Sequence, residues 1–262
     1  MMNFQIGDYV TRNSYNNDII FKIIDIDKDT YYLKGFSVRL YADSSVEDLV
    51  KCDVKKDQEE ENEFIERIKE KKLDDRSDYF YLPGKILHID GDKEYLNKCM
   101  RYYKNINLMA MGINEKEDQV PLKIRKLLEE YNPNILVITG HDAYYKKRGG
   151  INDISAYKNS ENFAKAVSEA RKFEKSHEKL IIIAGACQSD YEELIKAGAN
   201  FASSPKRINI HALDPAIIAS SMSLADINSD IDLKEIISKT KYGKEGIGGI
   251  ITKGTMYKGY PR

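Results

Sequence analysis

The stretch Ile135-Leu136-Val137-Ile138-Thr139-Gly140-His141-Asp142 decides the fold, because four apolar residues lead directly into a turn that carries a histidine. A second stretch, Leu180-Ile181-Ile182-Ile183-Ala184-Gly185-Ala186-Cys187, has the same form and ends in a thiol. Uninterrupted apolar runs bounded by turn residues are typical of parallel strands that are buried on both faces. Sites in such sheets form just outside the carboxyl ends of the strands. The two runs therefore predict an α/β sheet with His141 and Cys187 at neighbouring strand ends.

An alternation of apolar strands and amphipathic segments extends outward from these two runs, which is typical of an α/β domain. Strand-helix-strand units of this kind form right-handed crossovers. The expected architecture is a three-layer α/β/α sandwich with a mainly parallel sheet, as in flavodoxin-like folds. The strands are expected at 85–90, 106–112, 134–140, 180–186 and 200–204, and the helices near 93–103, 119–131, 160–174 and 189–198.

The C-terminal part adds two expected helices, near 214–225 and 232–240. Asp214-Pro215 opens the first of them with the sequence of a cap followed by a proline. The glycine-rich stretch at 246–251 is expected to be a bent strand. It does not fit a phosphate-binding loop, because no lysine followed by serine or threonine comes after these glycines.

The first 52 residues differ in character, because polar and apolar positions alternate and turn signals recur at Asn16-Asn17-Asp18 and Asp27-Lys28-Asp29. This pattern predicts short strands joined by tight turns. The expected unit is a small SH3-like β-barrel of about five strands over residues 1–52. Residues 53–82 are expected to be a charged linker, and residues 83–262 the catalytic α/β domain.

The composition argues against several classes of protein. The 262 residues carry a net charge of -1, so no overall field directs the chain to nucleic acid or to a membrane surface. No run approaches the roughly 20 apolar residues of a membrane span, and the N-terminus lacks the pattern of a secretory leader. The three cysteines, Cys52, Cys99 and Cys187, are widely spaced, which argues against a disulfide framework and against a structural zinc site. We therefore expect synthesis in a reducing, cytosolic compartment.

Cys187 and His141 suit nucleophilic catalysis. A thiol attacks a carbonyl carbon as the thiolate, and a nearby histidine or helix N-terminus favours that form. Cys187 precedes a predicted helix that Ser189 or Asp190 would cap. His141 lies 46 residues upstream of Cys187, and in caspases the histidine precedes the cysteine by about 50 residues. This order and spacing predict a hydrolase that acts through a thioester.

Other polar groups could complete the site. A developing oxyanion needs backbone donors, and the candidates are the amides of Cys187, Gly140 and Asp142. His211 lies beyond the fifth predicted strand, where it could line the same cleft, and it is the reserve base. His88 lies inside the first predicted strand and is expected to be structural.

Four segments of the chain carry a specific resemblance. They are Leu87-His88-Ile89-Asp90-Gly91-Asp92, Thr139-Gly140-His141-Asp142-Ala143, Ala184-Gly185-Ala186-Cys187-Gln188-Ser189 and Ala197-Gly198-Ala199-Asn200-Phe201-Ala202-Ser203-Ser204-Pro205-Lys206-Arg207. They resemble the YabG family of sporulation-specific cysteine proteases of spore-forming Firmicutes, from the N-terminal barrel to the final Gly-Tyr-Pro-Arg. The resemblance implies cleavage of spore coat and germination-related precursor proteins in the mother-cell cytoplasm, or in association with the spore coat.

The two strand-end blocks also resemble the caspase, legumain and clostripain clan, in which a histidine is followed later by a cysteine that alanine precedes. Ala186-Cys187 fits that pattern, whereas Asp142 stands where those enzymes carry glycine. The resemblance implies cleavage after one favoured residue, for which arginine is the expectation. An arginine needs a buried carboxylate for bidentate pairing, and Asp142, Asp190 and Asp214 are equal candidates.

These assignments imply a mechanism without a metal or an organic cofactor, with protein substrates as partners and no role for nucleic acid or a membrane. His141 would keep Cys187 ionised, protonate the leaving amine and later activate the water that hydrolyses the thioester. His211 is a further candidate for substrate binding. Self-cleavage is expected at basic sites in exposed stretches, such as Arg148 or the charged segment 53–78.

Two other classes of function fit parts of the pattern. A receiver-like phospho-switch would use Asp90 and Asp92 as its acidic cluster, but the third predicted strand ends in Gly140-His141 where that fold needs an aspartate. An amidotransferase-type hydrolase also uses cysteine and histidine, but its nucleophile usually precedes its histidine. Both remain alternatives to the peptidase.

Overall fold

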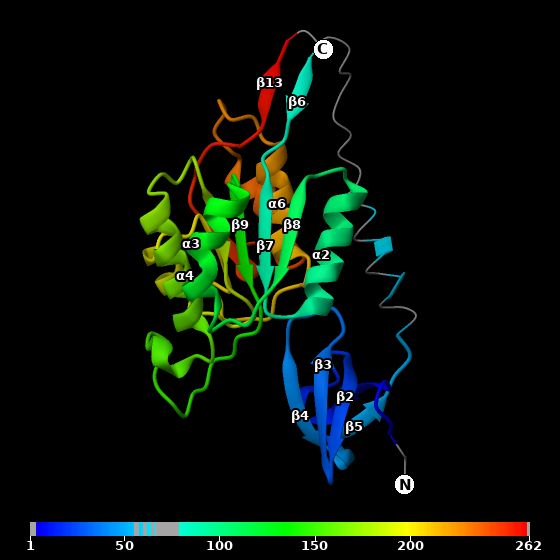
Figure 1. Cartoon of the computed structure of the whole chain (residues 1–262). Coiled ribbons are helices and arrows are strands. Elements are labelled where there is room, and N and C mark those ends of the chain that lie inside the picture. Colours follow the sequence, from blue (N-terminus) through cyan, green and yellow to red (C-terminus); the bar gives the residue numbers. More distant parts are fainter. Residues whose placement is uncertain (1–3, 55–57, 60–61, 64–65, 67–78, 261–262) are drawn as a thin grey trace. The chain divides into compact units, whose positions relative to one another are not determined.

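The structure, a computed structural model of the chain, describes residues 4–54, 58–59, 62–63, 66 and 79–260 (Figure 1). It divides into two compact units, Met1–Glu70 and Lys71–Arg262. Most of the predicted linker lies outside the described residues. Its last three residues, Phe80–Leu82, form strand β6, which pairs with β13 (Tyr257–Gly259) near the C-terminus. Within the described part of the chain, no helix combines the length and the apolar character that crossing a membrane requires.

The N-terminal unit is a five-stranded antiparallel sheet in the order β4-β3-β2-β1-β5. Its turns fall where the sequence predicts them: Asn16, Asn17 and Lys28 have φ values of 54°, 56° and 53°. Asparagine tolerates this left-handed backbone better than most residues, which explains the first turn. Strand side chains and one residue that precedes β1 make a small core, formed by Phe4, Val10, Phe21, Ile23, Leu33 and Leu49.

The second unit is built on a six-stranded sheet in the order β12-β11-β10-β9-β7-β8. Neighbouring strands from β8 to β11 pair in parallel, and β12 pairs antiparallel with β11 at the edge. The glycine-rich stretch therefore supplies a strand, as predicted. The strands β7, β9, β10 and β11 contain only buried residues, which agrees with their uninterrupted apolar sequence.

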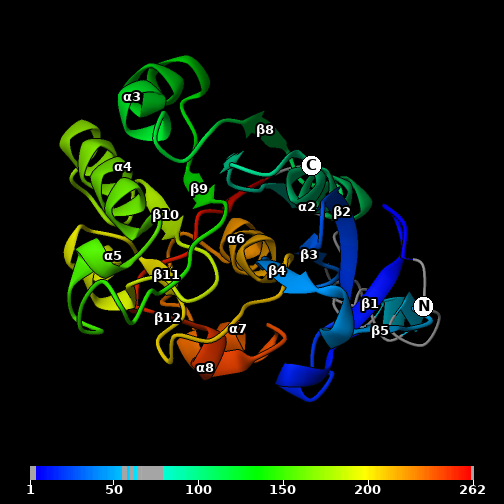
Figure 2. The same ribbon diagram turned by 90° about the horizontal axis from the view of Figure 1, so that it is seen from below.

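Helices cover both faces of this sheet (Figures 1 and 2). Helices α3, α4 and α5 pack on one face and share a core with alternate strand residues such as Leu136 and Ile182. Helices α2 and α6 lie on the other face, where α6 contacts β9 and β10. The unit is thus a mixed α/β fold with a largely parallel sheet between two layers of helices.

Two boundaries differ from the sequence prediction for local reasons. The second strand is Ala110–Asn114 rather than 106–112, because helix α2 continues to Asn105 and Asn107 makes a left-handed turn with φ 57°. Helix α6 begins at Asp214 itself, with Leu213 at the cap position and no side-chain cap. The carboxylate of Asp214 instead accepts hydrogen bonds from two amides outside the helix.

The strands are β1 (Tyr9–Arg12), β2 (Phe21–Asp27), β3 (Thr30–Gly35), β4 (Tyr41–Ser45), β5 (Leu49–Lys51), β6 (Phe80–Leu82), β7 (Ile86–Asp90), β8 (Ala110–Asn114), β9 (Ile135–Thr139), β10 (Ile181–Ala184), β11 (Phe201–Ser203), β12 (Ile247–Gly249) and β13 (Tyr257–Gly259). The helices are α2 (Lys93–Asn105), α3 (Val120–Tyr131), α4 (Ser160–Phe173), α5 (Tyr191–Lys196), α6 (Asp214–Leu224), α7 (Leu233–Ser238) and α8 (Gly243–Gly246), with short 3-10 helices at Asn13–Tyr15, Val46–Asp48 and Ile154–Ala156.

Candidate active site

His141 and Cys187 follow two adjacent parallel strands in the same register. Strand β9 pairs with β10 so that Ile138 lies opposite Ala184, and the ladder continues with a hydrogen bond from the Gly185 amide to the Ile138 carbonyl. His141 and Cys187 each come three residues after this last pair. The carboxyl end of the sheet therefore presents the histidine turn and the cysteine turn side by side, as the sequence predicts.

Hydrogen bonds tie the two turns together. The Ser189 hydroxyl donates to Oδ2 of Asp142 at 2.8 Å, and it accepts the amide of Ala186 at 2.9 Å. The amide of Tyr144 donates to Oε1 of Gln188 at 3.2 Å. The two turns therefore hold each other in position directly after the two candidate catalytic residues.

The Cys187 sulfur is fully buried. The amide of Ile210 donates to Sγ at 3.3 Å, and Sγ lies 3.8 Å from the carbonyl oxygen of the same residue. The turn is sharp: Gly185 and Gln188 have φ values of 103° and 59°. A Cβ at Gly185 would lie 2.8 Å from Cδ1 of Leu194, so both the backbone and the packing require glycine there. The segment that contains Ile210 covers the thiol.

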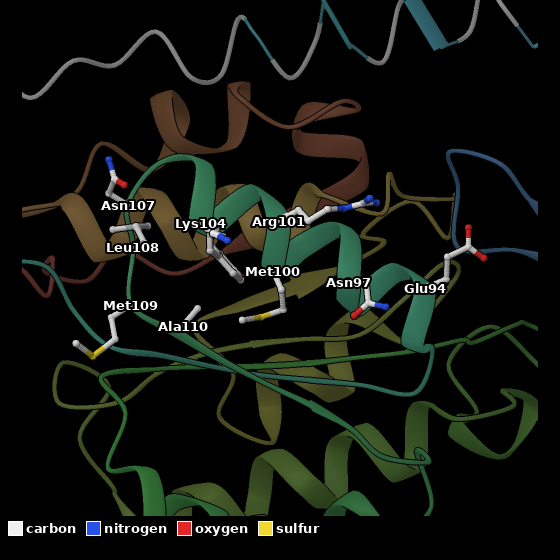
Figure 3. Close-up of a pocket in the computed structure, with 10 residues that line it drawn as sticks. Glu94, Asn97, Met100, Arg101, Lys104, Asn107, Leu108, Met109 and Ala110 are labelled. Carbon is white, nitrogen blue, oxygen red and sulfur yellow. The ribbon is translucent and has the colours of Figure 1, made fainter.

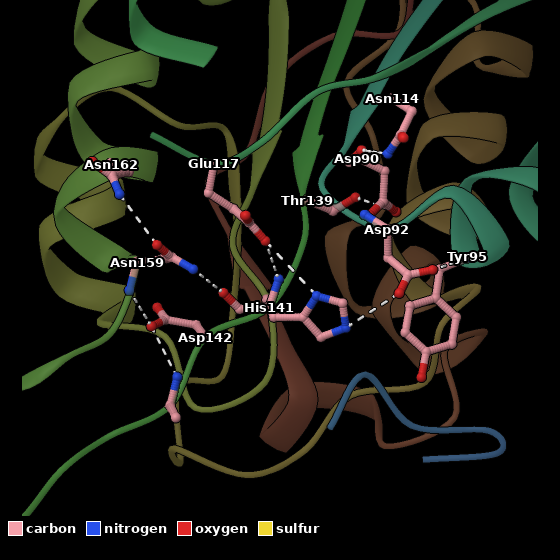
Figure 4. A network of polar contacts seen from close by, with 12 residues as sticks. Asp90, Asp92, Tyr95, Asn114, Glu117, Thr139, His141, Asp142, Asn159 and Asn162 are labelled. Carbon is pink, nitrogen blue, oxygen red and sulfur yellow. Dashed lines mark hydrogen bonds and ion pairs between the residues drawn. The ribbon is translucent and has the colours of Figure 1, made fainter. Parts of the chain in front are cut away.

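His141 lies between two carboxylates (Figure 4). Its Nε2 is 3.7 Å from Oδ2 of Asp92, and its Nδ1 is 3.8 Å from Oε1 of Glu117. The imidazole ring also contacts Tyr95, with ring centroids 5.7 Å apart. Asp92 caps helix α2 by accepting the amides of Glu94 and Tyr95 through Oδ1, so its other oxygen faces the histidine.

Glu117 holds the backbone of the histidine turn as well as its ring. Its Oε1 accepts the His141 amide at 2.8 Å. A Cβ at Gly140 or at Gly91 would lie within 2.4 Å of the same carboxylate, which explains glycine at both positions. Burial alone would raise the pKa of Glu117, but the hydrogen bonds from His141 outweigh it and lower that pKa below its usual value. Glu117 is therefore an ionised carboxylate beside the histidine at neutral pH.

A chain of buried polar groups supports Asp92 from behind. Asp90 Oδ1 accepts the amide of Asp92 at 2.9 Å, and its Oδ2 accepts the hydroxyl of Thr139 at 2.9 Å. His88 lies 3.2 Å from that hydroxyl through Nε2 and 3.0 Å from the Tyr103 hydroxyl through Nδ1. His88 is thus a hydrogen-bonded core histidine, as predicted. Asp90 holds Asp92, and Asp92 faces His141. Among the described residues, no cluster of three metal-ligating side chains is found.

Asp142 is a buried hub of hydrogen bonds. It accepts the hydroxyls of Ser160 and Ser189 and the amides of Ala143 and Asn159. Ser160 also accepts the amide of Asp190, so the hub joins the histidine turn, the start of helix α4 and the cysteine turn. Burial raises the pKa of Asp142, and these hydrogen bonds offset part of that rise.

The substitution Asp142→Asn is expected to change how stability depends on pH. A raised folded-state pKa means that the Asp142 carboxyl contributes most stability when protonated. That contribution is lost as pH rises from the unfolded value of 3.8 through the folded value. The melting temperature of the wild type minus that of the variant should therefore fall as pH rises above about 4. Thermal unfolding from pH 3.5 to 7 measures this difference, and a difference that grows with pH would contradict the assignment.

Asp190 binds the guanidinium of Arg207. Its Oδ1 lies 3.1 Å from Nη2 and accepts the Glu193 amide as the cap of helix α5. Among the described residues, no hydrogen-bond partner reaches its buried Oδ2. Arg207 has a left-handed backbone, with φ 54°, and also contacts Glu192 and the hydroxyl of Tyr157. Burial raises the pKa of Asp190, although the charge of Arg207 acts in the opposite direction.

Asp214 and His211 lie in one buried turn before helix α6. Asp214 accepts the amides of His211 and Lys241, and Nδ1 of His211 accepts the amide of Leu213 at 3.2 Å. His211 directly follows Ile210, the residue that contacts the Cys187 sulfur. His211 is therefore the neighbour of a residue that contacts the thiol. Its Nδ1, however, is hydrogen-bonded within its own turn.

A hollow of about 1040 Å³ lies elsewhere, along helix α2 and the start of β8 (Figure 3). Met100, Arg101, Lys104 and Met109 are among the residues that line it. Neither candidate catalytic residue lines this hollow, and it plays no part in the assignment of the site.

Asp92, Glu117 and Ile210 contact the candidate dyad, and the sequence analysis assigned them no role in catalysis. A signal for the first was present, because Asp92 follows β7, the other neighbour of β9, and has the sequence of a helix cap. Glu117 follows β8, which is one strand further away, and its side chain reaches the histidine across β7. The contact between Ile210 and Cys187 depends on tertiary folding, and no local sequence pattern predicts it.

Comparison with known proteins identifies the family of the chain. The sequence model of the family described as YabG peptidase U57 matches residues 5–261 of the chain. The chain is 44% identical to the "Sporulation-specific protease YabG" of Bacillus subtilis (strain 168), over 99% of each protein. No solved structure is significantly similar to it. A peptidase is neither a phospho-switch nor an amidotransferase, so both alternatives are set aside. The match over almost the whole chain confirms the resemblance, and the protein belongs to the YabG family of peptidases.

Proposed function

We propose that the chain is a cysteine endopeptidase in which Cys187 is the nucleophile and His141 the general acid and base. The supporting observation is the common register of β9 and β10, which sets the two residues three positions beyond the same pair. A histidine and an Ala-Cys pair on successive strand ends also support a caspase-like arrangement of the sheet. The antiparallel five-stranded unit at the N-terminus is compatible with an SH3-like barrel.

The reaction follows from these roles. The Cys187 thiolate attacks the carbonyl carbon of the scissile peptide, and the amide of Cys187 or one from Gly140 or Asp142 stabilises the oxyanion. The imidazolium of His141 protonates the leaving nitrogen as the C–N bond breaks, which leaves a thioester on sulfur. Neutral His141 then takes a proton from water, whose oxygen attacks the thioester and releases the new carboxylate and the thiolate.

Arginine before the scissile bond is the substrate preference that we propose, and Asp190 is the favoured carboxylate. The four hydrogen bonds to Asp142 and the two amides bound to Asp214 occupy those groups internally. Asp190 already binds a guanidinium, and its second oxygen has no hydrogen-bond partner among the described residues. A substrate arginine would take the place of Arg207 on this carboxylate.

Substrate access requires the segment from Ser204 to Ile210 to move, because Arg207 occupies Asp190 and Ile210 covers the sulfur. Ser204 and Arg207 both have left-handed backbones, with φ values of 64° and 54°. Non-glycine residues in this region store strain, so part of the cost of moving the segment is already present in the fold.

The biological role that we propose is proteolysis during sporulation, within the mother cell. The name of the Bacillus subtilis relative supports it, since that protein is called a sporulation-specific protease. Spore coat and germination-related precursors are the proposed substrates, and basic sites such as Arg148 are proposed sites of self-cleavage.

A peptidyl chloromethyl ketone that carries arginine tests the nucleophile and the specificity together. We expect one adduct, at Cys187, found by mass spectrometry of the digested protein, and a rate at least about 10-fold above that of the norleucine analogue. The matched control is the same reagent with Cys187→Ala. Adducts at Cys52 or Cys99 instead, or equal rates for both reagents, would overturn the nucleophile or the arginine preference respectively.

The substitution Asp190→Asn is expected to reduce kcat/KM for arginine peptides by about 100-fold, with little change for citrulline peptides, because the charge-assisted pair is lost. Asparagine is also a good helix cap, so the start of α5 is kept. Glu192→Gln is the matched control, since Glu192 pairs with the same Arg207 from an exposed position. An unchanged ratio of arginine to citrulline cleavage would move the specificity to another carboxylate.

A further inference from the structure

Two carboxylates that face the two nitrogens of His141 carry an inference that rests on the proposed function. Asp92 Oδ2 lies 3.7 Å from Nε2, and Glu117 Oε1 lies 3.8 Å from Nδ1 (Figure 4). All three side chains are mostly buried, with exposed fractions of 7%, 17% and 10% for Asp92, Glu117 and His141. We propose that Asp92 and Glu117 are positioning residues, which orient the imidazole and stabilise its protonated form during proteolysis.

The two carboxylates come from separate elements that are themselves fixed. Asp92 is held by the amides of Glu94 and Tyr95 and, through its own amide, by Asp90. Glu117 is held by the His141 amide. Each carboxylate is therefore oriented before the histidine gains its proton, which is the condition for electrostatic preorganisation.

Two carboxylates and a tyrosine face the ring. Asp92 faces it from the cap of helix α2, Tyr95 from the first turn of that helix and Glu117 from the loop after β8, and Asp90 lies behind Asp92. Two nearby negative charges favour a positive imidazolium over a neutral ring. They would thereby stabilise the thiolate-imidazolium pair that starts the reaction.

The contact between the carboxylates and His141 would assist both half-reactions. During acylation the imidazolium loses its proton to the leaving nitrogen, and during deacylation the neutral ring gains a proton from water. A fixed ring orientation serves both steps, because the same nitrogen must return to the same reacting centre. The carboxylates contact neither the sulfur nor the scissile peptide in this proposal, so they act only through the histidine.

Two conservative variants isolate the charge from the fold. Asp92→Asn keeps a side chain that caps helix α2, and Glu117→Gln keeps an oxygen that can accept the His141 amide. Glu115→Gln is the matched control, since Glu115 lies two residues from Glu117 and pairs with Lys123 instead. For each protein, kcat and KM are measured on a peptide that the wild type cleaves, between pH 5 and 10, together with the melting temperature.

We expect Asp92→Asn and Glu117→Gln to lower kcat by about 10- to 100-fold with KM within about twofold of the wild type. The pH profile of kcat should also differ from that of Glu115→Gln, because each substitution removes a negative charge next to the imidazole.

The outcomes separate this inference from the proposed function. If Cys187→Ala retains activity, the proposed function fails. If Cys187→Ala is inactive but both carboxylate variants match Glu115→Gln in kcat and pH profile, the positioning role alone is overturned. A loss of kcat with an unchanged profile and a lowered melting temperature also overturns it, because that result indicates only a structural role.

Discussion

Cys187→Ala is expected to abolish proteolysis while leaving the protein folded. Removal of the nucleophile from a covalent peptidase lowers kcat/KM by about 10³-fold or more, because only binding and oxyanion stabilisation remain. The sulfur is fully buried and contacts the backbone of Ile210, so its loss leaves a small cavity. We expect a decrease in the free energy of unfolding of about 1 kcal/mol. The measurements are kcat/KM on an arginine peptide and thermal unfolding.

Self-cleavage is a second test of the Cys187→Ala variant. Incubated wild-type protein should yield fragments that begin after basic residues, and Cys187→Ala should stay intact on the same gel. Cys52→Ala is the matched thiol control, since Cys52 lies in the N-terminal unit and should leave both activities unchanged. Identical fragments from wild type and Cys187→Ala would dismiss self-processing, and full activity of Cys187→Ala would end the proposed mechanism.

His141→Asn is expected to lower kcat/KM by about 10²- to 10⁴-fold, which is the range that a general acid and base contributes. The alkylation rate of Cys187 at neutral pH should also fall, because the imidazolium partner of the thiolate is lost. His177→Gln is the control, since His177 lies in the turn between helix α4 and strand β10 and contacts Arg171.

His211→Gln decides between the two candidate bases. The structure engages Nδ1 of His211 with the Leu213 amide, so this variant should keep most of the activity that His141→Asn loses. A large loss with His211→Gln together with near-normal activity of His141→Asn would exchange the two assignments. Steady-state rates at three pH values, with melting temperatures for each variant, suffice for this comparison.

Much of the α/β unit could be predicted from sequence because its signals are local. Strands β9, β10 and β11 and helices α3 and α4 begin and end within three residues of their predicted positions. Apolar runs mark buried strands and turn residues mark their ends, and both act over a few residues. The neighbouring ends of β9 and β10 follow from these signals together with the rules for parallel sheets.

The rest depends on contacts between distant parts of the chain. Strand β6 pairs with β13, which lies at the other end of the sequence of the same unit. Both strands have three residues, which is too short for an alternation of polar and apolar positions to be recognised. Arg207 reaches Asp190, and Ile210 reaches Cys187, through a turn whose left-handed residues are not glycine. Asp92 and Glu117 meet His141 only because β7 lies beside β9 and β8 lies beside β7 in the sheet order. Such contacts follow from tertiary packing, which no window of sequence encodes.

The complete burial of the Cys187 sulfur has a consequence for the chemical durability of the protein. Peroxides and disulfide reagents attack thiols that are ionised and accessible, and the higher oxidation products cannot be reduced again. A sulfur with no exposed surface is shielded from such damage while the segment around Ile210 stays in place. The segment around Ile210 that restricts substrate access would therefore also keep the thiol reduced during storage.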